Sequence, residues 1–341
     1  MNNKIINGQF FTTTNPFMLE PFLEWLHKIP DAVKQSTPLE PFAGSNNIPA
    51  MLSNINLLSK SWDCFDIEPS MVNNYPQSKV EQRDTINNFP IGYKLSITNP
   101  PYLGKTSAAT KKLPYPDTIY DDVYKLCLDK LLANVDYIAA IIPETFIVSG
   151  QFTDRLTTVI SLTCKMFDDT KCPVCLALFN PEPTNDFKIY RLNEFLGTYN
   201  DLSKYIPRPL LAHSWKINDP QGIIGLKCID SNKCPSVHFC LGSEIDSAKI
   251  KISSRLETRI STPETISDLP RFLDKCNEIL KEYRTNTKDV FLAPFKNLRK
   301  DGWYRRRLDF ATAKLIMSKA IEQVEVSENT YQPVDLFGGL L

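Results

Sequence analysis

The segment Tyr93-Lys94-Leu95-Ser96-Ile97-Thr98-Asn99-Pro100-Pro101-Tyr102 decides the fold, because a β-prone run is followed directly by two consecutive prolines. We predict a strand over Tyr93 to Thr98 from its β-branched and aromatic residues. Each proline fixes its φ angle and removes a backbone donor. The strand is therefore expected to end at Asn99, with polar groups presented just beyond it.

Strands and helices alternate on both sides of this segment, from Ser36 to Phe179. The predicted strands are Pro38 to Phe42, Trp62 to Ile67, Tyr137 to Ile142 and Val174 to Phe179, and the predicted helices are Ile48 to Leu58 and Tyr120 to Leu132. Such alternation is typical of βαβ units, an α/β class and a mainly parallel sheet. Ligands of such sheets bind at the carboxyl ends of the strands, so we expect the functional residues there.

A turn-rich linker, Asn180 to Asp186, separates this pattern from the rest of the chain. We place a domain boundary here, with one domain over residues 1–182 and the other over residues 183–341. The second is predicted to be mixed α+β, with several short strands and helices at Leu269 to Tyr283 and Leu308 to Val324. We find no internal repeats.

The composition is that of an ordinary globular protein. The chain has 341 residues, 42% hydrophobic and 23% charged, which argues against disordered, collagen-like and coiled-coil classes. Its longest strongly apolar stretch, Tyr137 to Pro143, is too short to cross a bilayer, and the chain begins with polar sequence. We expect a cytoplasmic protein that makes no membrane contact.

The cysteines and the charge distribution narrow the possible classes of protein further. Nine scattered cysteines and three histidines argue against a disulfide framework, and Cys172 and Cys175 form the only close pair. We expect two buried strand residues there rather than a metal site. The net charge is +0, but residues 1–185 carry 15 basic and 19 acidic residues, leaving 24 and 20 for residues 186–341. The basic second half is consistent with a polyanionic partner.

The residues Asn99-Pro100-Pro101-Tyr102 have a chemistry of their own. With two donors removed, the carbonyls of Asn99 and Pro100 can accept hydrogen bonds from an exocyclic amine, and the Asn99 side chain adds an acceptor. The Tyr102 ring offers a flat face for a base. The arrangement suits an amino group on a planar ring, although a plain strand-ending turn would also account for it.

On this motif the chain resembles the S-adenosylmethionine-dependent amino-methyltransferases, specifically the bacterial DNA adenine-N6 methyltransferases of restriction-modification type. Gly8 to Thr12 and Leu39 to Asn46 resemble two cofactor segments of that family, in the order of its gamma-type members. The resemblance implies a Rossmann-like class I methyltransferase sheet and a C-terminal target-recognition domain. A turn at Gly44 would let backbone approach the cofactor. The family has glycine where this chain has Asn46, which tolerates left-handed φ better than most residues.

The resemblance also implies roles for individual residues. The residues implied to hold S-adenosylmethionine are Phe11, Thr12, Glu40, Phe42, Gly44, Asp66, Ile67, Asp84 and Asn99. Asp66 would bind the ribose hydroxyls, Ile67 would pack on the adenine and Asp84 would accept from its amino group. Asn99, Pro100, Pro101 and Tyr102 would hold the target base, and Phe167 would stack on it. For Asp84 a surface loop acid, and for Phe167 a core phenylalanine, stay as alternatives.

Two basic groups are candidate DNA contacts. One comprises Lys105, Lys111 and Lys112, in a polar loop after the catalytic motif, and the other comprises Lys296, Arg299, Lys300, Arg305, Arg306 and Arg307. The second run holds one acid and two adjacent aromatics, Trp303 and Tyr304. A solvated charged face is the alternative.

The sequence therefore favours methyl transfer to the N6 amino group of adenine in double-stranded DNA, with the base flipped out of the duplex. This reaction needs no metal. The expected partners are double-stranded DNA and a cognate restriction endonuclease as a companion. Two alternatives stay open: transfer to an amino group in RNA or on a protein glutamine, and a DNA-binding protein whose cofactor site has decayed, which the replacement of glycine by Asn46 motivates.

Overall fold

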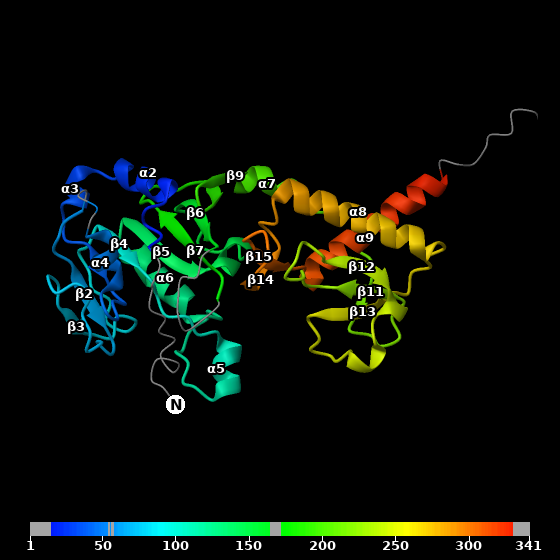
Figure 1. The fold of residues 1–341 in the computed structure, drawn as a ribbon, viewed down its shortest axis with the longest axis horizontal. Helices are drawn as coiled ribbons and strands as arrows, with labels where there is room; N and C mark the ends of the chain where they lie inside the picture. Colours follow the sequence, from blue (N-terminus) through cyan, green and yellow to red (C-terminus); the bar gives the residue numbers. More distant parts are fainter. Residues whose placement is uncertain (1–14, 54, 56–57, 164–171, 330–341) are drawn as a thin grey trace, which may run out of the picture. The chain divides into compact units, whose positions relative to one another are not determined.

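The computed structural model describes residues 15–53, 55, 58–163 and 172–329. The chain divides into two compact units between Asn200 and Asp201 (Figure 1). The boundary predicted after residue 182 therefore lies inside the first unit. The reason is that residues 188–198 form two further strands of that unit's sheet.

The first unit is built on a sheet with the order β3-β2-β1-β4-β5-β7-β6-β8-β9 among the described residues. Its strands are β1 Leu39–Glu40, β2 Asp63–Asp66, β3 Val80–Gln82, β4 Leu95–Thr98, β5 Tyr137–Pro143, β6 Leu156–Leu162, β7 Val174–Phe179, β8 Lys188–Arg191 and β9 Glu194–Thr198. Strands β3, β2, β1, β4 and β5 are parallel neighbours, whereas β7 runs antiparallel to β5 and β6. This confirms the predicted α/β class and its Rossmann-like sheet.

Described helices of this unit follow β1 and β4, as βαβ units require, and two more precede β1. The helices are α2 Glu20–Lys28, α3 Asp31–Lys34, α4 Asn47–Leu52, α5 Lys105–Lys111 and α6 Val123–Asn134, with a 3₁₀ helix at Glu144–Val148, and α7 Tyr199–Ser203 spans the division between the units. Helix α6 begins at Asp122, whose carboxylate accepts from the Tyr124 backbone amide, and it contacts β5. None of the described helices is long and apolar enough to cross a membrane.

Burial explains why the central strands could be predicted. All residues of β4 and β7, and all but the first of β5, are buried, as in a sheet covered on both faces. Both Cys175 and its neighbours on β7 belong to this core, and burial raises the pKa of the Cys175 thiol. The eight described cysteines are free, and the described residues contain no group of His, Cys, Asp and Glu suited to a metal ion.

The second unit is the predicted mixture of helices and short strands. Its described elements are β10 Lys216–Ile217, β11 Ile224–Lys227, β12 His238–Leu241, β13 Glu257–Ser261, α8 Leu269–Thr287, β14 Ala293–Leu298, β15 Tyr304–Arg307 and α9 Phe310–Asn329, with 3₁₀ turns at Gly242–Glu244 and Ser247–Lys249. An antiparallel sheet has the order β10-β13-β11-β12, and β14 pairs with β15. Helix α8 contacts α9 and β12, burying Phe272 beside Trp215.

Candidate active site

The carboxyl ends of β1 and β4 are joined through their side chains. Glu40 ends β1 and is 1% exposed. Its Oε1 accepts from the Thr98 hydroxyl at 2.6 Å, and Thr98 ends β4 directly before Asn99. The same oxygen accepts from the Phe42 backbone amide at 3.0 Å, while Oε2 has no hydrogen-bond partner among the described residues. Glu40 thus fixes the loop after β1 beside the Asn-Pro-Pro-Tyr segment.

Burial gives Glu40 an unusual charge state. Desolvation raises the pKa of Glu40 to about 8, against the lowering effect of the hydrogen bonds from Thr98 and Phe42. The carboxyl group is therefore mainly protonated at neutral pH.

We predict that Glu40→Gln flattens the pH dependence of stability. Because the folded-state pKa is raised, the stability contributed by Glu40 is fully present below its unfolded value of 4.5 and is lost as pH rises through about 8. The wild type should lose roughly 3–5 kcal/mol relative to Glu40→Gln across this window. Denaturant unfolding of both proteins at pH 5 and pH 8.5 measures it, and parallel pH profiles would contradict it.

The loop after β1 forms a left-handed turn held by the end of β2. Gly44 has φ 52° and donates its amide to Asp66 Oδ2 at 2.9 Å, while Asp66 Oδ1 accepts from the Glu68 amide at 2.9 Å. Asn46, at φ 59°, is fully buried and donates from Nδ2 to the Ser78 carbonyl at 2.8 Å. Asn46 therefore adopts the left-handed backbone that asparagine tolerates better than most residues.

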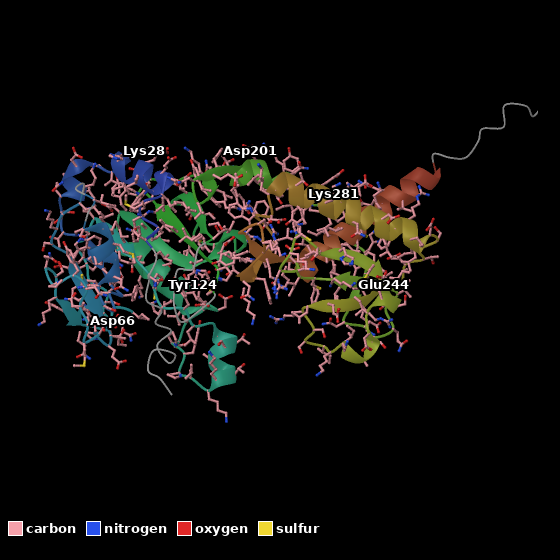
Figure 2. All side chains as sticks on the ribbon, viewed as in Figure 1. Lys28, Asp66, Tyr124, Asp201, Glu244 and Lys281 are labelled. Carbon is pink, nitrogen blue, oxygen red and sulfur yellow. The ribbon has the colours of Figure 1, made fainter. Side chains whose placement is uncertain are left out.

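The acid Asp66 lies at the end of β2, where its placement can be followed in Figure 2. The next residue, Ile67, is 50% exposed and so presents an apolar surface beside the buried carboxylate of Asp66. Asp84 comes shortly after β3 and accepts from the amides of Ile86 and Asn87 at 3.2 Å and from the Asn87 side chain at 2.8 Å. Asp84 thus organises its own loop, in keeping with the structural alternative.

The segment after β4 is fixed by a short network. The Tyr102 hydroxyl hydrogen-bonds to Asn99 Oδ1 and, at 2.6 Å, to the Ile141 carbonyl of β5. The Tyr102 ring is 8% exposed and meets Tyr124 of α6 edge-on, with 6.4 Å between ring centres; Tyr124 is labelled in Figure 2. Burial raises the pKa of the Tyr102 hydroxyl well above its ordinary value.

The structure gives Tyr102 a positioning role that the sequence did not predict. Its hydroxyl holds the side chain of Asn99. The ring is 8% exposed and packs edge-on against α6, and its role in stacking on a base stays a prediction. Sequence reasoning missed the positioning role because Ile141 is 39 residues away in the chain.

The sequence also gave no role to Asp122. Its Oδ1 accepts from the Leu103 amide at 3.1 Å, and the Leu103 carbonyl accepts from the Val123 amide at 3.1 Å. Asp122 thereby ties the residues after the motif to the start of α6. An acid before an apolar helical run is an N-cap signal, and it was the signal available in the sequence.

Several predicted site residues lie elsewhere or are not described. Phe11, Thr12 and Phe167 lie outside the described residues. Phe42 is partly buried against the hydrophobic cluster of Leu103, Ala108, Val123 and Cys127. Lys105 and Lys111 belong to helix α5, not to the expected loop, and Lys112 ends that helix; all three are exposed.

Three of the expected DNA contacts in the second unit are structural. Arg299 is 7% exposed and pairs with Asp230 at 2.9 Å and with Asp301 at 3.0 Å, and Arg306 is 2% exposed and donates to the Leu292 carbonyl at 3.4 Å.

Arg305 donates to the Asp230 carbonyl at 2.6 Å, and its guanidinium lies over the Phe295 ring. These three guanidinium groups satisfy interior acceptors, so they do not form the phosphate-contacting row that the sequence predicted. Lys296 and Lys300 are exposed, and Arg307 is half-buried.

Several solved structures are similar to parts of this chain at low sequence identity. No protein-family model matches the chain, and no curated protein does. A proposed class I S-adenosylmethionine-dependent methyltransferase from Listeria monocytogenes matches 54% of this chain and 66% of its own, with 14% identity and a TM-score of 0.41. A type I restriction-modification methyltransferase subunit from Streptococcus thermophilus matches 57% and 52%, with 16% identity and a TM-score of 0.37.

A third similar structure is the type I restriction enzyme EcoKI M protein, matched over 96% of this chain and 74% of its own, with 11% identity and a TM-score of 0.39. The chain thus spans between about half and two thirds of the first two structures.

Proposed function

We propose that this chain is an S-adenosylmethionine-dependent methyltransferase that acts on the N6 amino group of adenine in double-stranded DNA. The observation that carries the proposal is the convergence of three strand ends. The Glu40–Thr98 and Gly44–Asp66 hydrogen bonds hold the loop after β1 against the ends of β4 and β2, with Asn99 and the two prolines directly beyond.

The residues at this edge fit the cofactor. Asp66 supplies a buried carboxylate for a ribose diol, Ile67 an exposed apolar surface for an adenine ring, and the Gly44 turn a close backbone approach. Since Asn46 keeps the left-handed turn, the departure from glycine no longer favours a decayed cofactor site. S-adenosylmethionine, when bound, supplies an electrophilic methyl group on a sulfonium.

The motif after β4 would activate the target amine. The nitrogen lone pair of adenine N6 is delocalised into the ring. The N6 amino group would donate hydrogen bonds to the Asn99 side chain and the Pro100 carbonyl. These hydrogen bonds favour a tetrahedral nitrogen, whose localised lone pair points at the electrophilic methyl group. Tyr102 contributes by holding the Asn99 side chain from behind. The target adenine has to leave the duplex to reach these groups.

Mass spectrometry of methylated bases tests the proposal. We expect purified protein with S-adenosylmethionine to form N6-methyladenine in duplex DNA and to leave RNA and protein glutamine unmodified. Sequencing of DNA from expressing cells then reports the target sequence. Methylation of RNA or protein alone would replace the proposed substrate. A companion endonuclease stays a prediction.

We predict that Asp66→Ala weakens S-adenosylmethionine binding by about 1–3 kcal/mol, the usual cost of leaving hydrogen-bonding groups unpaired. Asp66→Asn is the matched control, because one amide oxygen can still accept from Gly44 and so preserve the turn. Calorimetric titration of both variants separates lost ligand contacts from a lost turn. An unchanged dissociation constant for Asp66→Ala would place the cofactor elsewhere.

A further inference from the structure

A cavity of about 240 Å³ opens in the second unit where β15 meets α9. It is lined by Arg255, Arg307, Leu308, Asp309 and Phe310. Arg307 pairs through its backbone within β15, but neither guanidinium group makes a hydrogen bond or an ion pair with a described residue, which sets these two side chains apart from the other arginines nearby. Arg284, Arg299 and Arg305 each bind an acid or a carbonyl of the same unit.

Backbone hydrogen bonds fix the two walls of the cavity. The Cys228 amide donates to the Leu256 carbonyl at 2.9 Å, next to Arg255. The Cys228 carbonyl accepts from the Leu308 amide at 2.9 Å, next to Arg307. Cys228, directly after β11, therefore joins the two segments that carry the arginines. These hydrogen bonds fix the backbone at both arginines before any ligand binds.

The charges of this cavity favour an anion. Two guanidinium groups facing one space repel each other, and a shared anionic group removes that repulsion while accepting from both. The one acid in the lining, Asp309, already accepts from the Thr312 amide at 2.9 Å and from its hydroxyl at 2.8 Å at the start of α9. Leu308 and Phe310 add apolar contacts of the kind that a sugar or base makes.

We propose that this cavity is a binding site for a backbone phosphate of DNA, held by Arg255 and Arg307. The identity of the anion rests on the proposed function, whereas the site itself rests on the cavity and its two unpaired arginines. Arg307 keeps the role that the sequence predicted for it. Arg255 is a new contact, which lies 52 residues before Arg307 in the chain (307 − 255).

Affinity for duplex DNA across a salt series tests this site. Each neutralised phosphate contributes about 0.9 to the slope of log affinity against log salt. Because both arginines hold one phosphate, the double variant Arg255→Ala/Arg307→Ala should flatten the slope by up to about 0.9 on two duplexes of unrelated sequence. Arg255→Lys/Arg307→Lys keeps both charges and should restore most of it. Arg208→Ala removes an exposed charge outside the cavity and serves as the control, and thermal melting checks each fold.

The outcomes separate this site from the proposed reaction. The phosphate site would be overturned if the double alanine variant kept the wild-type slope of log affinity against log salt. It would also be overturned if the variant kept that slope but no longer distinguished the two duplex sequences. An equal effect of Arg208→Ala, or full competition by inorganic phosphate at concentrations near those of the DNA, would also overturn it. If the wild type transfers no methyl group to DNA while the slope changes as expected, the reaction fails and the site stands.

Discussion

Replacing Asp230 by alanine is expected to destabilise the second unit by about 3–5 kcal/mol, the range for breaking a buried ion pair by removing one partner. Asp230 is fully buried. Its carboxylate accepts from the two terminal nitrogens of Arg284, Nη1 and Nη2, at 2.8 and 2.9 Å, and from Nη1 of Arg299 at 2.9 Å. It also accepts from the backbone amides of Ser236 and Arg306. The substitution would leave these donors buried without their shared acceptor.

The pKa of Asp230 is consistent with this role. Burial raises it, but hydrogen bonds and charge from Arg284, with help from Arg299, hold the pKa at about 2. Because the folded-state pKa is depressed, this stability is present above the unfolded value of 3.8 and is lost as pH falls through about 2. The network should therefore resist mild acid.

Urea unfolding followed by tryptophan fluorescence measures the effect, since Trp215 lies in this unit. Glu278→Ala is the matched control: it breaks a pair with Lys275 in which the glutamate is 55% exposed, and exposed pairs are worth less than about 1 kcal/mol. A loss at Asp230 as small as at Glu278 would contradict the role that we assign to the network.

This network also shows where sequence reasoning stops. Asp230 lies 54 residues from Arg284 and 69 from Arg299, so no local pattern could pair them. One signal was present: side chains alternate between the faces of a strand, and in β15 Tyr304 and Arg306 are buried while Arg305 and Arg307 are less so. A basic run on a strand cannot place all its charges on one face.

The fold itself was more predictable than its contacts. Strands β4, β5 and β7 are buried on both faces, β5 and β7 are almost wholly apolar, and each of the three was predicted within a few residues. β3, with its mainly exposed residues, and the added strands β8 and β9 carry no such run. The positions of Asp66 and Asn99 followed from predicted strand ends. Glu40 was predicted inside the strand Pro38 to Phe42, and its hydrogen bond from Thr98 depends on tertiary packing.

Replacing Asn99 by alanine is expected to lower the rate of methyl transfer by on the order of 10²–10³-fold, the usual effect of deleting one positioned hydrogen-bonding group from an active site. Binding of S-adenosylmethionine should be largely intact, because the Glu40–Thr98 and Gly44–Asp66 hydrogen bonds do not involve the Asn99 side chain. Single-turnover rates with saturating cofactor report the chemical step, and calorimetry reports the cofactor affinity.

Tyr102→Phe supplies the graded comparison for Asn99→Ala. It removes the hydroxyl that hydrogen-bonds to Asn99 Oδ1 and to Ile141 while keeping the buried ring beside Tyr124. If the hydroxyl acts by positioning Asn99, this variant should lose part of the rate, and the double variant should be no slower than Asn99→Ala alone, because both changes act through one group. Multiplicative losses would show that Tyr102 acts on the substrate independently, and near-wild-type turnover of Asn99→Ala would remove the motif from the mechanism.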